Sequence, residues 1–263
     1  MRVEHLFASV VAMTLLASSA SPLGELVGRA RPVSLAGEQV LPVLTPLAKL
    51  LPGGGLRRGS VVVVPSSSAS GASGATSLAL ALIAAVSHAG LWCAGVGLPD
   101  LGPAVAAELG IALERFPLIP TPAEQWAIVT AALIDTVDAV LVRPARRVGP
   151  AEARRLRARA RERGAVLVPC SDSWPEGADL RITVIRSGWQ GLGQGHGFLR
   201  TRMIEVAASG RGAASRERRT RLWLPGPDAA VAEYGGGDRL VADQRAGGRL
   251  AADLQVRGRL AAG

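Results

Sequence analysis

The chain has 263 residues, enough for one sizeable domain with short appendages. Apolar residues make up 48% of it and charged residues 19%, a composition that excludes an intrinsically disordered chain. The formal net charge of +9 comes from arginine, since Lys49 is the only lysine. This charge favours nucleic acid or acidic partners, although a GC-rich genome also raises arginine content. The charge alone therefore does not establish DNA binding.

The first segment has some features of a secretion signal. An apolar run spans residues 6–17, with Arg2 before it and Ser18-Ser19-Ala20 after it. Glu4 weakens the charged start that a signal peptide needs, and the run is too short to span a bilayer. We therefore expect residues 1–38 to form an N-terminal helical region of a cytoplasmic protein without membrane contact.

The central part alternates between predicted strands and helices. Residues 60–64 contain an all-valine run typical of a strand buried on both faces, and a Ser/Gly-rich loop over 66–74 leads into a helix over 76–89. Further strands are expected at 91–96, 116–119, 139–142 and 165–169, and further helices at 103–109, 123–134 and 150–163. This order predicts an α/β fold with a mostly parallel sheet flanked by helices.

After residue 179 the pattern changes to apolar alternation without helices. Segments 180–186, 202–207 and 220–224 predict antiparallel strands that extend the sheet, so the core is expected over 39–228. Beyond it, the motif Gly-Arg-Leu-Ala recurs at 248–251 and 258–261. Such short echoes cannot form a core, so 229–263 is expected to be a flexible tail or a segment that folds on a partner.

The loop before the helix at 76–89 occupies the place of a phosphate-binding P-loop but departs from its pattern. That pattern, GxxxxGK[ST], uses glycines to bring backbone N–H groups to the phosphates, a lysine to neutralise them and a hydroxyl to hold magnesium. Gly74 and Thr76 match it, whereas Ala69 replaces the first glycine and Ala75 the lysine. Weak nucleotide binding through Gly71, Gly74 and Thr76 remains the alternative to a purely architectural loop.

Two further hydrolytic groups are missing. The strand at 139–142 is followed by Arg143 where a magnesium-binding aspartate is expected, and the first acid after the strand at 91–96 is Asp100. With three requirements unmet, the sequence predicts no catalytic residue, no enzyme activity and no cofactor. No metal site is expected either, because the histidines His5, His88 and His196 are scattered. Cys93 and Cys170 lie in apolar runs and are expected to be reduced core residues.

Several blocks over residues 41–226 resemble the RecA recombinase family in order and spacing. They are the lead-in Leu-Leu-Pro-Gly-Gly-Gly-Leu-Arg-Arg-Gly at 50–59, the segment 93–111 and the run Thr-Pro-Ala-Glu-Gln at 121–125. The resemblance implies a RecA-like P-loop NTPase core. Only one helix fits between residues 142 and 165 and only a short turn between 169 and 178, where RecA carries its two DNA-binding loops. A RecA-type filament is therefore not expected.

The motifs Trp-Gln-Gly-Leu-Gly at 189–193 and Arg-Leu-Trp-Leu-Pro at 221–225 make the chain look most like actinobacterial ImuA-prime proteins. That resemblance implies a cytoplasmic, nucleoid-associated accessory protein of the SOS response and of induced mutagenesis by translesion synthesis. Its partners would be the Y-family-like protein ImuB and, through it, an error-prone replicative-type DNA polymerase, with DNA contact direct or indirect. The alternatives are an ATP-dependent recombination or repair protein and a damage-induced inhibitor of cell division.

An accessory protein works through recognition, which favours exposed aromatic and arginine side chains. The predicted partner-binding residues are Arg211, Arg216, Arg218, Arg219, Arg221 and Trp223. The arginine-rich helix at 150–163 is either a solvent-facing helix or a contact for DNA phosphates.

Overall fold

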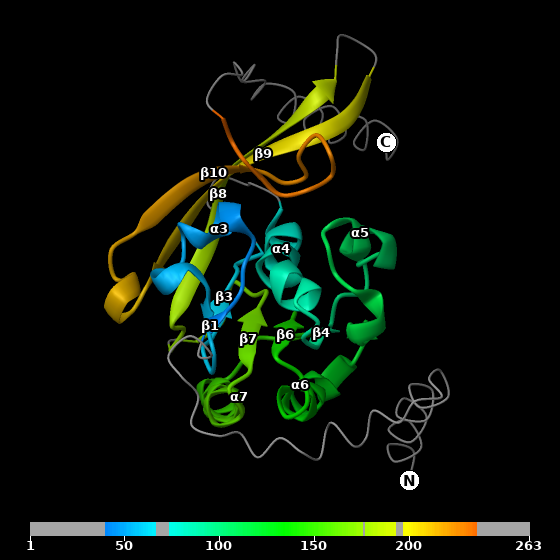
Figure 1. The fold of residues 1–263 in the computed structure, drawn as a ribbon. Coiled ribbons are helices and arrows are strands. Elements are labelled where there is room, and N and C mark those ends of the chain that lie inside the picture. Colours follow the sequence, from blue (N-terminus) through cyan, green and yellow to red (C-terminus); the bar gives the residue numbers. More distant parts are fainter. Residues whose placement is uncertain (1–39, 67–73, 176, 193–196, 236–263) are drawn as a thin grey trace, which may run out of the picture. The chain divides into compact units, whose positions relative to one another are not determined.

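The computed structural model describes residues 40–66, 74–175, 177–192 and 197–235, which form an α/β fold (Figure 1). The predicted N-terminal region, Gly71, His5, His196 and most of the predicted tail lie outside these residues. Within the described part of the chain, no helix has both the length and the apolar character needed to cross a bilayer.

A four-stranded parallel sheet has the order β5-β4-β6-β7. Its strands are β4 (Cys93–Val96), β5 (Leu118–Ile119), β6 (Ala139–Val142) and β7 (Val166–Pro169). The connections carry α5 (Pro103–Glu108), η3 (Leu113–Arg115), η4 (Ala123–Gln125), α6 (Trp126–Ile134) and α7 (Pro150–Arg163). Every residue of β4, β6 and β7 is buried, as their continuous apolar runs predict for strands covered on both faces.

A second, mixed sheet has the order β11-β10-β9-β8-β3. Its members are β3 (Val62–Val63), β8 (Leu180–Leu192), β9 (Gly197–Gly210), β10 (Arg218–Trp223) and β11 (Ala232–Glu233). Strand β3 runs parallel to β8, whereas the remaining pairs are antiparallel. The predicted antiparallel extension is confirmed, with β8 and β9 longer than expected.

Strand β3 also connects the two sheets. Val64 N–H donates to Pro169 O at 2.9 Å and Leu167 N–H donates to Ser60 O at 3.0 Å, so β3 lies alongside β7 as well as β8. The chain leaving β3 continues towards helix α4 (Ala75–His88). The region expected to resemble a P-loop therefore follows a strand that is held on both sides.

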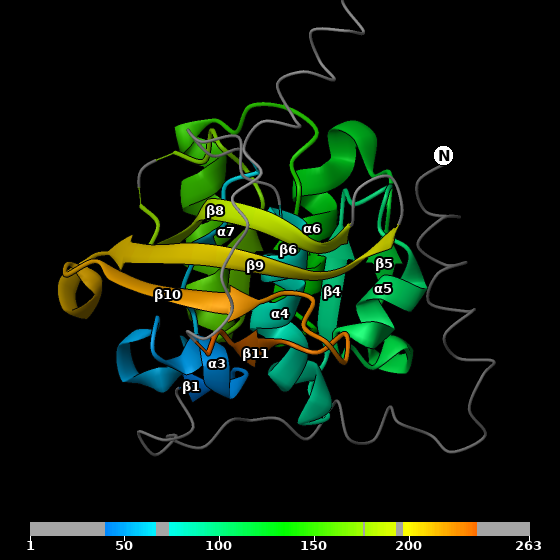
Figure 2. The ribbon, with the colours of Figure 1, turned by 90° about the horizontal axis from the view of Figure 1, so that it is seen from above.

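Helix α4 lies in the main hydrophobic core. Ten of its residues are buried, which suits a helix that is apolar on nearly all sides. Its side chains pack in one cluster with Ile182, Ile204 and Leu222 of the mixed sheet, and Figure 2 shows β8, β9 and β10 crossing over it. A second cluster, on the other face of the parallel sheet, contains Trp126 of α6 and Leu156 of α7. His88 is exposed at the end of α4.

The lead-in before β3 is short and mostly irregular. Strand β1 (Val40–Leu41) pairs with β2 (Leu56–Arg57), and between them lie α3 (Thr45–Ala48) and η2 (Pro52–Gly54). Gly53 and Gly54 have φ of +77° and +75°, a backbone region that glycine adopts without strain. The glycine run therefore makes the turn that returns the chain to β2.

The ordered core continues past residue 228, the boundary expected from sequence. Strand β11 pairs with β10, and the rings of Trp223 and Tyr234 lie 5.1 Å apart. Lys49 Nζ lies 2.8 Å from Glu233 Oε1, which joins this end of the core to the lead-in. The first residues of the predicted tail are therefore part of the mixed sheet, because an aromatic contact and a strand pairing hold them there.

One buried ion pair links the lead-in turn to the parallel sheet. Arg58 Nη1 donates to Asp138 Oδ1 at 2.9 Å, and the Asp138 side chain is only 5% exposed. We expect Asp138→Ala to lower the free energy of unfolding by about 3 kcal/mol, because it leaves a half-buried guanidinium without this carboxylate. Urea denaturation measures the change. Asp100→Ala, at a side chain 91% exposed, is the control and should change stability by less than about 0.5 kcal/mol.

Both cysteines are buried and free, as expected from sequence. Burial raises the pKa of Cys93 and of Cys170 to about 12, so both thiols stay protonated near neutral pH. Since the thiolate is the reactive form, we expect no rapid reaction with Ellman's reagent in the native protein and reaction of both cysteines in guanidinium chloride. Rapid labelling of the native protein would show that β4, which contains Cys93, or the chain directly after β7, which contains Cys170, opens.

Candidate functional site

The candidate site lies at the carboxyl ends of β4 and β6, beside the first turn of α4. Gly74 is the N-cap residue of α4, with φ of +114° and no side-chain cap. Thr76 follows in the first turn. The structure therefore places the two described P-loop candidates at the amino end of a 14-residue helix, where backbone N–H groups favour negative charge.

Arg143 occupies the place where sequence reasoning looked for a magnesium-binding carboxylate. It is the residue directly after β6, and its Nη2 donates to Thr76 Oγ1 at 2.7 Å. In a working P-loop this hydroxyl binds magnesium. Here a guanidinium donates to the hydroxyl, so a positive charge lies next to the oxygen that would bind the cation.

Asp100, the nearest acid after β4, is too loosely held to replace the missing groups. Its Oδ2 lies 3.9 Å from Arg143 Nη1 and its side chain is 91% exposed. Both residues line a pocket of about 280 Å³ together with Thr76, Ser77, Leu80, Leu98, Leu101, Gly102 and Val105. Across the described ranges there is no cluster of three or more His, Cys, Asp or Glu side chains that could hold a metal ion.

The ends of β4 and β6 approach each other closely at Gly97. A Cβ on Gly97 would lie 2.1 Å from Arg143 O, and the residue has φ of +71°. Only glycine fits this contact without a shift of the backbone. The close approach therefore helps to set where Arg143 leaves the sheet.

Arg202, in β9, is a site residue that sequence reasoning did not identify. It is only 6% exposed, and its guanidinium carbon lies 3.0 Å from the position that a Cβ on Gly74 would take. Nε donates to Leu224 O at 2.7 Å, and the guanidinium lies 4.9 Å from the centre of the Trp189 ring. Burial lowers the pKa of this side chain. Only tertiary packing shows its role, because in the sequence it is one arginine among many.

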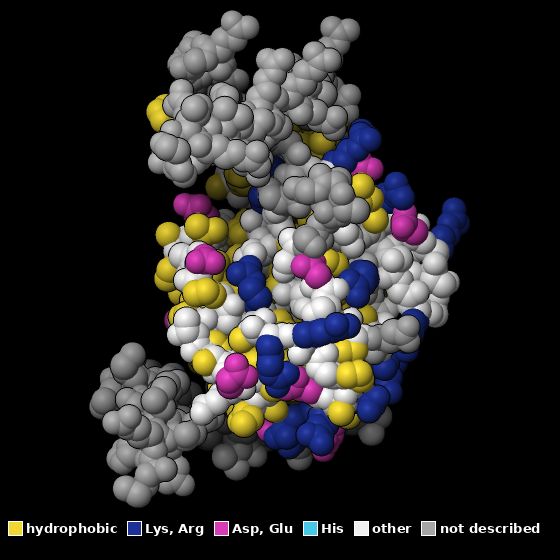
Figure 3. Space-filling model, turned by 180° about the vertical axis from the view of Figure 1, so that it is seen from behind, with side chains coloured by type: hydrophobic (Ala, Val, Ile, Leu, Met, Phe, Trp, Pro, Cys, Tyr) yellow, Lys and Arg dark blue, Asp and Glu magenta, His cyan; other side chains and the backbone are white. Residues whose placement is uncertain are grey.

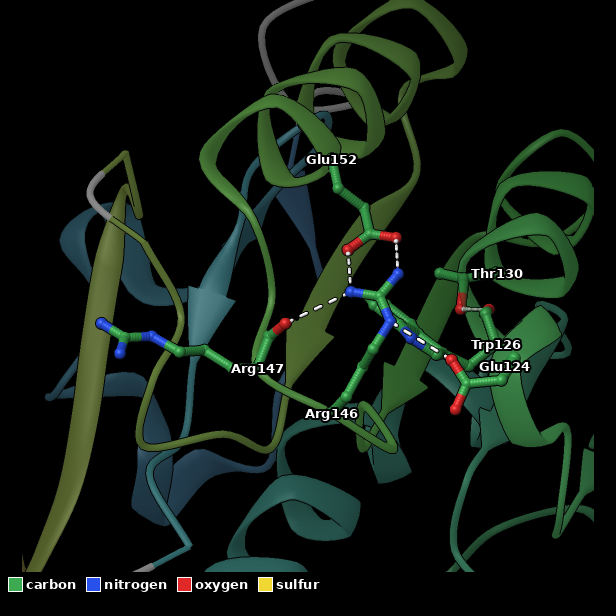
Figure 4. A network of polar contacts seen from close by, with 6 residues as sticks. All are labelled: Glu124, Trp126, Thr130, Arg146, Arg147 and Glu152. Atoms are coloured by element: carbon green, nitrogen blue, oxygen red, sulfur yellow. Dashed lines mark hydrogen bonds and ion pairs between the residues drawn. The ribbon is translucent and has the colours of Figure 1, made fainter.

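The loop after Arg143 is held by a polar network (Figure 4). Arg146 donates to both carboxylate oxygens of Glu152 at 2.9 and 3.1 Å, and its Nε lies 3.4 Å from Glu124 Oε2. The guanidinium also lies 5.9 Å from the centre of the buried Trp126 ring. These contacts tie the loop to both α6 and α7, which limits the positions open to the chain next to Arg143.

The predicted partner-binding residues differ in their exposure and in their ion pairs. Arg219 pairs with Glu217 and Arg221 with Glu205, so two of the charges are matched locally. Trp223 packs on Tyr234 and is only partly exposed. Arg211 and Arg216 are exposed, and Arg218 is partly exposed. Partner binding by these residues stays a prediction.

The clearest exposed apolar surface is on the β8–β9 hairpin instead. Trp189 is 44% exposed, Phe198 79% and Leu199 51%, and Figure 1 shows the paired ends of these strands extending past α4. In the sequence, Trp189 stands out only as part of the motif at 189–193 that carries a family resemblance, and no signal singles out Phe198 or Leu199. Apolar alternation indicates a strand but does not tell which face another element covers.

Helix α7 presents arginines to solvent, and part of its charge is neutralised within the fold. Arg159 and Arg163 both pair with Asp135, whose pKa they lower, chiefly through the hydrogen bond from Arg159. Arg157 pairs with Asp179 at 3.2 Å. Figure 3 shows Lys and Arg side chains gathered on the lower part of the face opposite to the view of Figure 1, with acidic side chains among them. The solvent-facing interpretation accounts for these paired arginines.

Comparison with known proteins matches the part of the chain that contains Thr76 and Arg143. Residues 49–176 match the family described as the MT3502 N-terminal domain. The uncharacterized protein Rv3395c of Mycobacterium tuberculosis is 36% identical over 150 residues, which cover 55% of this chain and 73% of that protein. The family match ends before β8, so the hairpin with Trp189 and Phe198 lies outside it.

The site geometry yields a prediction about hydrolysis. We expect purified protein with ATP and magnesium to release no more phosphate than its Thr76→Ala variant, with or without single-stranded DNA, because Arg143 binds the hydroxyl. Ala75→Lys should not restore turnover, since it supplies no carboxylate for magnesium. The rate of phosphate release measures the activity of the unaltered chain and of the two variants. Turnover in the unaltered chain that Thr76→Ala abolishes would contradict this interpretation of the site.

Proposed function

This chain belongs to the family of the Mycobacterium tuberculosis protein Rv3395c, and we propose that it is a RecA-like, non-catalytic accessory protein of damage-induced mutagenesis. In this role it binds ImuB and, through it, an error-prone replicative-type DNA polymerase during translesion synthesis. The proposal includes a cytoplasmic, nucleoid-associated location.

The observation that carries the proposal is the hydrogen bond from Arg143 to Thr76. A hydrolytic site of this type needs a lysine, a magnesium-holding carboxylate and a catalytic acid, and the chain has Ala75, Arg143 and a loosely held Asp100 instead. The strand and the helix that would flank such a site are nevertheless present. Retained architecture without its hydrolytic groups supports a role in binding rather than in turnover.

The topology supports the RecA-like part of the proposal. Strand β3 leads through a loop into α4 and lies next to β7 in line with the parallel strands β6, β4 and β5. The residues after β7 continue into antiparallel strands, as the apolar alternation after residue 179 predicted. The turn between β7 and β8 is short, which is consistent with an adaptor that lacks the second RecA-type DNA-binding loop.

The exposed hairpin supports the partner-binding part of the proposal. Trp, Phe and Arg are enriched in the energetically dominant residues of protein interfaces, and the hairpin presents Trp189, Phe198 and the exposed Arg200. Arg202 lies under Trp189 and holds the ring by a cation–π contact. A pre-ordered aromatic ring loses less conformational entropy on binding than a mobile one.

A complementation experiment in the source organism tests this function. Deleting the gene should lower the frequency of mutations induced by ultraviolet light, and a copy carrying Thr76→Ala should restore it, because hydrolysis is not needed. A copy carrying Trp189→Ala and Phe198→Ala should restore it poorly, by loss of a partner contact. Ile128→Ala is the matched control, since Ile128 is 68% exposed on α6 and lies outside the hairpin.

Affinity purification from damaged cells identifies the partners directly. The tagged chain should recover a Y-family-like protein and an error-prone polymerase subunit, and the hairpin variant should recover less of both. If neither is recovered from soluble, induced bait, or if the deletion leaves induced mutation frequency unchanged, the proposed function is wrong. Cell elongation on overexpression with no change in mutation frequency would favour a division inhibitor instead.

A further inference from the structure

A second pocket lies at the opposite end of β3 from the candidate site. It has a volume of about 280 Å³ and is bordered by the lead-in turn, the last part of α7, the start of β8 and η5 (Gly212–Ala214). Its apolar lining comes from Leu51, Leu56, Val62, Leu180 and Ala214, all of which are buried core residues. The floor of the pocket is therefore rigid and apolar.

The residues around this pocket carry an excess of positive charge. Arg57, Arg161 and Arg211 line it and are exposed, and no ion pair or side-chain hydrogen bond holds them within the described ranges. The fourth arginine, Arg58, is paired with Asp138. The acid at the rim, Asp179, accepts hydrogen bonds from Arg157 and from Val61 N–H, so its charge is already matched. Three guanidinium groups thus remain for an external partner.

We propose that this pocket binds an acidic segment of a partner protein, with one apolar side chain in the pocket and carboxylates against Arg57, Arg161 and Arg211. The inference rests on the proposed adaptor function and deepens it by naming the chemistry of a partner. Arg211 is one of the partner-binding residues expected from the sequence. The inference places it at this pocket and not on the surface of β10.

The pocket is large enough to take an anchoring side chain. Sites for cofactors and drug-sized ligands usually enclose about 300–1,000 Å³, so this pocket lies just below that range. Interface anchors commonly fill such pockets, while charges around them set orientation and association rate. A pocket with an apolar floor and a basic rim therefore fits a peptide in which acidic residues flank one large apolar residue.

Selection from a random peptide library displayed on phage tests the proposal with the purified full-length chain. The selected peptides should be acidic with one or more large apolar residues. Affinity, measured by fluorescence anisotropy of a selected peptide, should fall at least about tenfold in the Arg57→Glu, Arg211→Glu double variant, because like charges then oppose each other. Ala213→Trp fills the pocket mouth from an exposed position and should weaken binding without changing the charge.

Arg154→Glu with Arg155→Glu is the matched control. Both side chains are exposed on α7 outside the pocket, and the net charge changes by the same amount. Unchanged affinity in this control supports the pocket, whereas an equal loss in both double variants would show attraction by net charge alone and overturn it. Selected peptides without acids, no selected peptides at all, or binding unaffected by Ala213→Trp would also overturn the proposal.

One further outcome would assign the pocket to this chain's own C-terminal residues. If the full chain binds acidic peptides only after Asp238, Asp243 and Asp253 are replaced by Asn, an internal segment is the occupant and the partner proposal is wrong. All of these measurements use the isolated protein. A negative result with the peptides, together with a mutagenesis defect in the deletion strain, would reject the pocket and leave the proposed function standing.

Discussion

The pairing of β3 with both β7 and β8 is the constraint on which the rest of the structure depends. Val64 N–H bonds to Pro169 O on one side, and Val62 is paired with Leu180 on the other. Because neither side of β3 is a free edge, its valines are buried on both faces and its ends cannot shift independently. Its carboxyl end leads towards α4 and the candidate site, and its amino end borders the second pocket. The geometry of the candidate site and of the second pocket thus depends on one strand.

Two arginines reach the start of α4 from other elements of the fold. A lysine at the position of Ala75 would be held by the loop itself, whereas Arg143 and Arg202 reach the start of α4 from β6 and β9. Burying a guanidinium without a carboxylate costs free energy, and Arg202 recovers part of it through Leu224 O and the face of Trp189. Arg143 recovers part through Thr76. The positive charges therefore stabilise contacts between elements that are distant in the sequence.

Much of the fold could be predicted from the sequence, because buried parallel strands and capped helices have strong local signals. Strand β6 and helix α7 have the predicted bounds. An apolar run defines β6. Helix α7 begins after Gly149, at Pro150, and ends before the left-handed Gly164. Strand β8 was predicted to end at 186 but continues to Leu192, because its pairing with β9 persists through two register shifts. Local pattern does not show such bulges, which depend on the partner strand.

The candidate site was less predictable than the fold, because contacts between side chains of distant elements leave no local signal in the sequence. The sequence shows directly that Ala75 stands where a lysine is expected and Arg143 where a carboxylate is expected. In contrast, the contact between Arg143 and Thr76 joins residues 67 apart and depends on how β6 packs beside α4. Likewise, the ion pairs of Arg219 with Glu217 and of Arg221 with Glu205 depend on neighbouring residues and on the register between β9 and β10. Arginine content alone does not show such pairing.

The separation of the hairpin from the second pocket also bears on how the proposed adaptor would work. Trp189 and Phe198 lie on the β8–β9 hairpin, whereas Arg57, Arg161 and Arg211 surround a pocket at the amino end of β3. Substitutions that share no contacts usually have additive effects, so changes at one region should leave binding at the other intact. A protein that must hold two partners at once gains from this arrangement, because each partner can be bound without displacing the other.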